Sequence, residues 1–220
     1  MNDRDIPNVL LTGFEPFGGE RINPSGEIVR ALDGAVVNGH RVVTAILPVA
    51  FASTLPRLEA LLETHRPVLA LATGQAGGRS ELSIERVAAN LIDARIADAD
   101  GAQPIDEPVI VDAPAAYFST LPVKAMLARL RVLGIPASLS QSAGAYVCNQ
   151  AFYALAHLVA TRYRGTRAGF VHVPWLPEQA ARHQGQASMA LETMIAGVRA
   201  AIECAVATRR DLRVAGGSTH

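Results

Sequence analysis

The stretch NVLLTGF, residues 8–14, is a short apolar run that ends at a glycine-containing loop, as a buried strand does. Two runs of the same kind follow it, RVVTAILPV at 41–49 and PVLALATGQ at 67–75. Segments with helical periodicity separate the three runs. Apolar strands that alternate with amphipathic helices predict an α/β fold, in which a largely parallel sheet is covered by helices on both faces.

Local signals place the two intervening helices. Ser25 is expected to cap a helix that ends near Leu32. Pro56 is expected in the first turn of a second helix that runs to about His65, since proline is tolerated there. Beyond residue 75 the alternation of apolar strands and amphipathic helices becomes less regular.

The second half of the chain contains one ambiguous segment, ELSIERVAAN at 81–90, which we interpret as extended. Residues 92–117 are rich in Asp, Pro and Ala and predict loops and hairpins. The remaining expected elements are a helix at 123–134, a strand at 135–141, a tight turn and helix from Gly144, a strand at 167–175 and a helix at 188–210.

Length and composition suit a single globular domain. The chain has 220 residues, of which 50% are hydrophobic and 18% charged, so it can bury a large core. We expect a single catalytic domain over residues 1–220, arranged as a single-domain three-layer α/β/α sandwich, with a core at about 8–210 and a short flexible tail at 211–220. Twenty basic and twenty acidic residues cancel, which argues against nucleic acid or a membrane as the main partner.

Cysteine use and the N-terminal sequence indicate a cytoplasmic protein. MNDRDIPNVLLTGF lacks the pattern of a signal peptide, and no segment approaches the roughly 18 apolar residues of a membrane helix. Neither Cys148 nor Cys204 has a default disulfide role in a reducing compartment. CxxC and HExxH are absent from the sequence, so we expect no metal and no cofactor.

Cys148 lies in GAYVCNQAFYALAH, residues 144–157, where a turn leads into a helix. A single free cysteine is most often inert core packing. At a helix N-terminus, however, the unpaired N–H groups and the macrodipole stabilise a thiolate, so its pKa is expected to fall towards neutrality. Cys204, within the last helix, has no such field and is expected to be unreactive.

A cysteine nucleophile needs a base and a group that orients the base. Among the six histidines, His172 lies in a short strand that follows the cysteine's helix, so both should emerge near one rim of the sheet. Glu85 lies in an apolar stretch and is costly to bury without a partner such as an imidazole. Its alternative is an ion pair with Arg86 or Arg79 at the surface, and a buried structural role stays open for His172. Glu15 and Asp93 are weaker rivals of Glu85.

Two glycine-rich loops, GFEPFGGER at 13–21 and GQAGGRSE at 74–81, lack the spacing of phosphate-binding motifs. We interpret both as loops in which the backbone approaches a small ligand closely. Phe14 and Phe17 in the first loop either anchor in the core or meet an apolar face of a substrate.

Five motifs in order resemble the pyroglutamyl peptidase I family, a set of cysteine peptidases that remove an N-terminal pyroglutamyl residue from peptides. The resemblance runs from about Val9 to Gln179. Its motifs are LLTGFEPFGG followed by INPS, GQAGGR, ERVA followed by DARI, SAGAYVCN and GFVHVPWLPEQ.

The resemblance implies a catalytic triad of Cys148 as nucleophile, His172 as base and Glu85 as orienting acid. It also implies an open sandwich around a mixed, mostly parallel sheet, a homo-oligomer that is commonly a homotetramer, and peptide substrates that begin with pyroglutamate. A thioester acyl-enzyme would be the intermediate. The further residues expected in the substrate pocket or near the oxyanion are Phe14, Phe17, Gln75, Arg95, Ile96, Tyr146 and Val147, with Arg95 beside the catalytic cysteine.

The sequence departs from the family pattern next to the nucleophile. The family commonly has phenylalanine where this chain has Tyr146. An added hydroxyl in the pocket wall would bear on substrate affinity more than on activity. Two alternatives remain at this stage, a nucleoside-phosphorylase-like enzyme, which would need a basic phosphate site and no Cys148, and a non-catalytic small-molecule binder with a redox-sensitive thiol.

Overall fold

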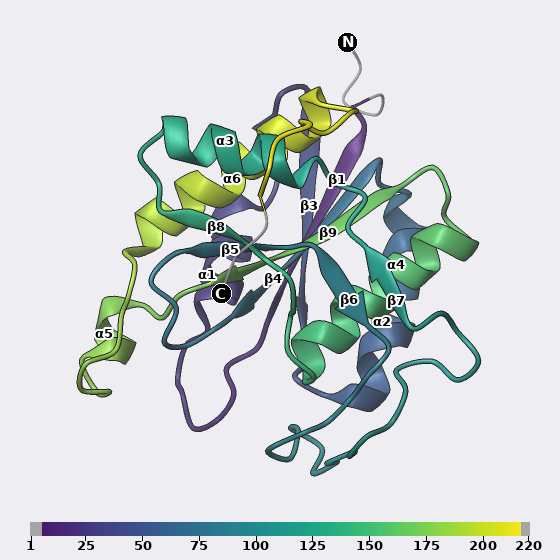
Figure 1. Cartoon of the computed structure of the whole chain (residues 1–220), viewed down its shortest axis with the longest axis vertical. Helices are drawn as coiled ribbons and strands as arrows, with labels where there is room; N and C mark the ends of the chain where they lie inside the picture. Colours follow the sequence, from purple (N-terminus) through teal and green to yellow (C-terminus); the bar gives the residue numbers. More distant parts are fainter. Residues whose placement is uncertain (1–5, 217–220) are drawn as a thin grey trace.

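The computed structural model describes residues 6–216, which form a seven-stranded sheet with helices on both faces (Figure 1). The strand order is β2-β3-β1-β4-β9-β5-β8. Neighbours among β3, β1, β4 and β9 pair in parallel, whereas β2 pairs antiparallel to β3 and β5 antiparallel to β9. The predicted fold class, an α/β/α sandwich with a mixed and mostly parallel sheet, is therefore confirmed.

The bounds of the elements follow the predicted ranges closely. The strands are β1 (Asn8–Phe14), β2 (Val36–Val37), β3 (His40–Leu47), β4 (Leu69–Gln75), β5 (Leu82–Glu85), β6 (Val87–Ala89), β7 (Ala116–Phe118), β8 (Ala137–Ser140) and β9 (Arg167–Val173). The helices are α1 (Pro24–Leu32), α2 (Phe51–His65), α3 (Val123–Val132), α4 (Val147–Thr161), α5 (Pro177–Ala180) and α6 (Leu191–Ala207).

The two faces of the sheet bury separate apolar clusters. Helices α1, α3 and α6 cover one face, and α2 and α4 cover the other (Figure 1). The central strands β1 and β4 are buried almost throughout because helices pack on both of their sides, which explains their continuous apolar sequences. None of the helices in the described part of the chain is long and apolar enough to cross a membrane.

Two predicted helix starts were wrong in detail. Asn23, not Ser25, caps α1: its Oδ1 accepts from the backbone N–H of Ser25 at 3.1 Å, and the buried Ser25 hydroxyl instead accepts from the N–H of Phe14. Helix α2 begins at Phe51, so Pro56 lies inside the helix and not in its first turn. Asp98, from a distant loop, accepts from the N–H of Phe51 at 2.7 Å and so supplies a cap that no local pattern revealed.

The predicted tail is partly held by contacts. The carboxylate of Asp211 accepts from the backbone N–H groups of Lys124 and Ala125 at the start of α3. Lys124 also donates to the carbonyl of Val214. These contacts involve residues 211–214 of the expected tail, whose flexibility stays a prediction, and residues 217–220 lie outside the described residues. The predicted extent of the single domain stays a prediction.

Asn149 fixes the start of α4 against the rest of the fold. Its buried side chain accepts from the N–H of Ala89 at 3.0 Å and donates to the carbonyls of Ala89 and Leu91, both at 2.9 Å. One amide thus bonds three backbone groups of β6 and the loop beyond it. Since Cys148 precedes Asn149, these bonds also fix the position of Cys148.

We expect Asn149→Ala to lower the free energy of unfolding by about 2–3 kcal/mol, because it leaves buried backbone groups without partners. Chemical denaturation with urea, followed by circular dichroism, measures the change. Gln141→Ala, at an exposed residue, is the matched control and should stay within about 0.5 kcal/mol of the wild type. Equal stability of the Asn149 and Gln141 variants would contradict the assigned role.

Candidate active site

The candidate site lies where α4 begins above the middle of the sheet. Gly74 of β4 pairs with His172 of β9, and His172 pairs on its other side with Ser83 of β5. Cys148 is the second residue of α4 and lies over Gly74. A Cβ at Gly74 would come within 2.7 Å of the Cys148 Sγ and 2.8 Å of the Phe170 ring, so only glycine allows the helix start to sit this close to the sheet.

His172 is held by a buried carboxylate. Its Nδ1 lies 2.7 Å from Oε1 of Glu85, and both side chains are almost fully buried. The ring of Phe170 lies beside the imidazole, with 4.8 Å between ring centroids. The hydrogen bond at Nδ1 fixes the orientation of the ring and leaves Nε2 as the nitrogen that can accept a proton.

Arg79 is the second partner of Glu85. Its Nη1 donates to the same Oε1 at 2.8 Å, and the Arg79 side chain is 33% exposed, whereas the Glu85 side chain is fully buried. The two interpretations of Glu85 from sequence, an ion pair with Arg79 and a bond to an imidazole, therefore both hold. Arg86 instead points to the side chain of Gln141. Sequence reasoning treated Arg79 only as a surface partner, although a buried carboxylate calls for a nearby cation.

Burial sets the protonation of the pair. Desolvation, together with the smaller effect of the negative charge of Glu85, raises the pKa of the Cys148 thiol to about 12, and Arg79 acts in the opposite direction. Desolvation likewise lowers the pKa of His172, although Glu85 opposes this shift. The expectation that the helix start brings the thiol pKa towards neutrality is thus contradicted, because the thiol is desolvated. Both shifts favour a thiol and a neutral imidazole in the resting pair at neutral pH.

A narrow pocket opens beside Cys148. Its cavity volume is about 10 Å³, far below the roughly 300–1,000 Å³ of pockets for drug-sized ligands, so it is a narrow slot that only a small group could enter. Phe14, Phe17, Gln75, Tyr146 and Val147, all expected from sequence, line it together with Cys148 and with two residues that sequence reasoning missed, Asn23 and Val49. No lining residue apart from the cysteine is ionisable near neutral pH.

The side-chain amide of Gln75 has a fixed orientation. Gln179, which is fully buried in α5, donates from Nε2 to Oε1 of Gln75 at 2.9 Å and to Glu20 at 3.2 Å. Glu20, in the loop that carries Phe17, also accepts from Arg182. Because the Gln75 oxygen is engaged, its NH₂ group is the part that can serve a ligand. Nothing in the local sequence pairs Gln179 with Gln75.

Arg95 and Ile96 do not line this pocket. Both are exposed, and the cation that acts on Cys148 is Arg79. The hydroxyl of Tyr146 points away from the pocket and donates to the carbonyl of Ala97 at 3.0 Å. The departure at Tyr146 therefore ties the loop that carries Arg95 and Ile96 to the start of α4, and its hydroxyl is engaged by that loop.

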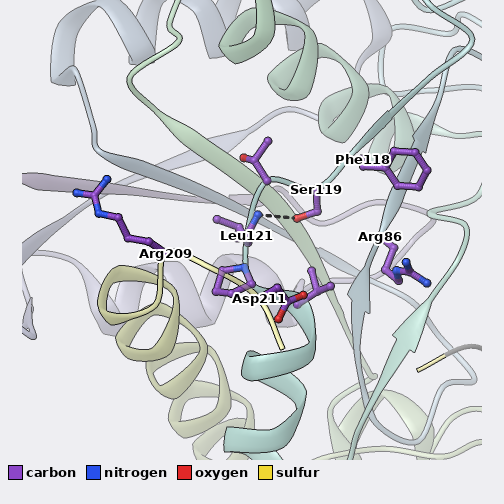
Figure 2. A pocket seen from close by; sticks show the side chains of 9 residues that line it. Arg86, Phe118, Ser119, Leu121, Arg209 and Asp211 are labelled. Carbon is purple, nitrogen blue, oxygen red and sulfur yellow. Dashed lines mark hydrogen bonds between the residues drawn. The ribbon is translucent and has the colours of Figure 1, made fainter. Parts of the chain in front are cut away.

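A second pocket lies apart from these residues, where the loop after β7 meets the start of α3. Figure 2 shows Arg86 and Arg209 on opposite sides of it, with Asp211 between them. Asp211 already bonds the first N–H groups of α3, so the helix start is not open to a ligand. Among residues 6–216, no group of His, Cys, Asp and Glu side chains is arranged to hold a metal ion.

A thiol at a helix start lies over Gly74, whose strand partner His172 is oriented by a buried carboxylate. This set of groups is typical of cysteine-dependent hydrolases. The sequence model described as "Pyroglutamyl peptidase" matches residues 7–208. The chain therefore belongs to this family of cysteine peptidases, and the resemblance found in its motifs is confirmed.

Relatives cover almost the whole chain. The chain is 56% identical to a pyrrolidone-carboxylate peptidase of Cupriavidus taiwanensis over 98% of its length and 100% of the relative's. Its structure is similar to that of pyroglutamyl peptidase I from Bacillus amyloliquefaciens, with a TM-score of 0.93, 38% identity and coverage of 95% of this chain and 99% of the other. A mutant pyrrolidone carboxyl peptidase from Pyrococcus furiosus gives a TM-score of 0.88, with 45% identity and coverage of 91% and 98%.

We expect alkylation of Cys148 by iodoacetamide to rise with pH through an apparent pKa above the about 8.5 of a free cysteine. Because Glu85 and Arg79 carry opposite charges, removing them should shift this apparent pKa in opposite directions. Glu85→Gln should lower it, and Arg79→Gln should raise it. Mass spectrometry of a Cys204→Ser background at pH 6 to 10 measures the rates. An apparent pKa near 7 in the parent protein would mean that the helix N-terminus outweighs desolvation.

Proposed function

We propose that this protein is a cysteine exopeptidase that removes an N-terminal pyroglutamyl residue from peptides. The observation that carries the proposal is the small uncharged pocket next to Cys148. A pyroglutamyl ring is a neutral five-membered lactam, so it suits an apolar slot with a few polar groups. The rings of Phe14 and Phe17 would contact the lactam ring, and the Gln75 NH₂ would donate to the lactam carbonyl.

In the proposed mechanism, Cys148 attacks the carbonyl that joins the lactam ring to the next residue. The Nε2 of His172 takes the thiol proton during the attack, since the resting thiol and imidazole are both neutral. Glu85 stabilises the imidazolium that forms, and Arg79 donates a charge-assisted hydrogen bond to the same Glu85 oxygen. The oxyanion would be held by the backbone N–H of Cys148, at the positive end of α4.

The tetrahedral intermediate then loses the peptide amine. The His172 imidazolium gives its proton to the departing nitrogen as the C–N bond breaks, and a thioester joins the pyroglutamyl group to Cys148. Water, deprotonated by the same imidazole, attacks the thioester. The C–S bond breaks, the acid product is released, and the imidazolium returns its proton to the Cys148 sulfur. Both half-reactions need the imidazole to exchange a proton at one nitrogen while the other nitrogen stays bonded to Glu85.

Family membership favours this proposal over the two alternatives. A phosphorylase needs a cluster of cations at its ligand pocket, and the lining of the Cys148 pocket contains no basic residue. A binder with a redox-sensitive thiol would not need the buried Glu85 and His172 pair. A cytoplasmic location, which a free catalytic thiol suits, stays a prediction that cell fractionation tests.

We expect the protein to hydrolyse a chromogenic pyroglutamyl amide, with prolyl and glutamyl amides as poor substrates. Cys148→Ser should lower kcat/KM by at least about 10³-fold, because the nucleophile and its base act as a unit. Cys204→Ser is the matched control and should retain activity. An inactive wild type, or full activity in Cys148→Ser, would contradict the proposal.

We also propose that the chain forms a homo-oligomer, a dimer or a tetramer. The support is the presence of exposed apolar side chains on the segment 111–118, namely Val111 at 72% exposure and Phe118 at 68%. Light scattering should give a mass of two or four chains, and Phe118→Lys should reduce it. Val132→Lys, at an exposed position of α3, is the control; a monomeric wild type would refute this proposal.

A further inference from the structure

The face of the sheet that carries the candidate triad continues to the sheet edge. Gly74, His172, Ser83 and Ser138 are consecutive partners across β4, β9, β5 and β8. Residues directly opposite one another in a sheet point to the same face. The row therefore leads from the glycine beneath Cys148, through the base, to two serines.

A neighbouring row repeats this order. Phe170 pairs with Glu85, and Glu85 pairs with Ser140 of β8. Leu139, between the two β8 serines, packs against the apolar cluster on the opposite face. The half-exposed Ser138 and Ser140 thus form a polar extension of the catalytic face beyond Glu85.

The order of the strands gives the substrate a direction. The pocket for the ring lies towards β1 and β4, which carry Phe14 and Gln75. His172, on β9, is the group that protonates the departing amine, so the departing peptide must leave Cys148 on the side of β9. Beyond β9 along this face lie β5 and then β8.

An open groove occupies that position. Its cavity volume is about 360 Å³, against about 10 Å³ for the ring pocket, so it has room for more than one residue. Arg79, which contacts Glu85 at 2.8 Å, connects the groove to the triad. The groove is lined by Gly78, Arg79, Ser80, Glu81, Ser83, Ser138, Leu139 and Ser140.

We infer that this groove, which we call the serine groove, binds the residues that follow the pyroglutamyl residue of a peptide substrate. The inference rests on the proposed function and extends it to the departing side of the cleaved bond. The hydroxyl of Ser140 already bonds the backbone of Ser142, and Ser83 is buried. Ser80, Ser138 and one residue of each charge remain to hydrogen-bond an extended backbone without selecting one kind of side chain. The serine groove is therefore a subsite for peptide length, with weak preference for the identity of the residues bound.

Two substrates that both begin with the pyroglutamyl ring, but differ in length, test the inference. A pyroglutamyl hexapeptide reaches the serine groove, and a small chromogenic pyroglutamyl amide does not. Ser138→Trp should lower kcat/KM for the hexapeptide about ten-fold more than for the amide, because bulk on β8 blocks the peptide alone. Val132→Trp, on an exposed position of α3, is the matched control and should leave the ratio of the two substrates as in the wild type.

A charged residue at position 138 allows a second measurement, whose expected result poor folding of the variant cannot produce. With hexapeptides that carry Lys or Glu at the third position, Ser138→Glu should favour the Lys peptide and Ser138→Lys the Glu peptide. The expected change is about three-fold in kcat/KM in each direction, the size of a surface ion-pair effect.

The outcomes separate this inference from the proposed function. If the wild type does not cleave the small amide, the proposed function fails. If it cleaves the amide, the serine groove is overturned by equal effects of Ser138→Trp on both substrates, or by the absence of opposite charge preferences in the two charged variants.

Discussion

The site depends on one buried carboxylate. Glu85 is fully removed from solvent, and its Oε1 accepts from both His172 and Arg79. A buried charge of this kind costs several kcal/mol unless hydrogen bonds and an opposite charge offset it. Arg79 supplies the charge and His172 supplies a bond that is useful in catalysis. Because Oε2 has no hydrogen-bond partner within residues 6–216, removal of either partner would leave Glu85 poorly compensated.

The sheet topology is what brings these groups together. In a wholly parallel sheet, the strand next to β9 would run in the same direction, and its loops would meet those of β4. Strand β5 instead runs antiparallel to β9, so Ser83 pairs with His172 and the next residue on that face, Glu85, lies beside the imidazole. The glycine at position 74 then lets α4 approach until Cys148 lies over the sheet. One reversed strand and one missing side chain thus assemble three residues that are far apart in the chain.

Much of this arrangement could be predicted from sequence, because local patterns carry it. Apolar runs gave the strands, and the turn before Cys148 gave its place at a helix start. The rest depends on distant contacts. Asp98 caps α2 from another loop, Gln179 orients Gln75 across more than a hundred residues, and the thiol pKa follows from desolvation that no single motif encodes. The DARI motif suggested that Arg95 lies beside the cysteine, but its side chain is exposed. The cation that acts on Cys148 is instead Arg79, which the motif did not indicate.

The neutrality of the resting site bears on which N-termini it accepts. An ordinary peptide begins with an ammonium group, and burying it beside Phe14, Phe17 and Val49 would remove its water without providing a carboxylate. Glu20, an acid of the loop that carries Phe17, is already bonded to Arg182 and Gln179. Each 1.4 kcal/mol of uncompensated desolvation reduces binding about ten-fold, so a penalty of several kcal/mol suffices for strong discrimination. Under the proposed function, the pocket would select a lactam chiefly by excluding charge. The same desolvation raises the pKa of the Cys148 thiol, which would join the protonation of the nucleophile to the choice of substrate.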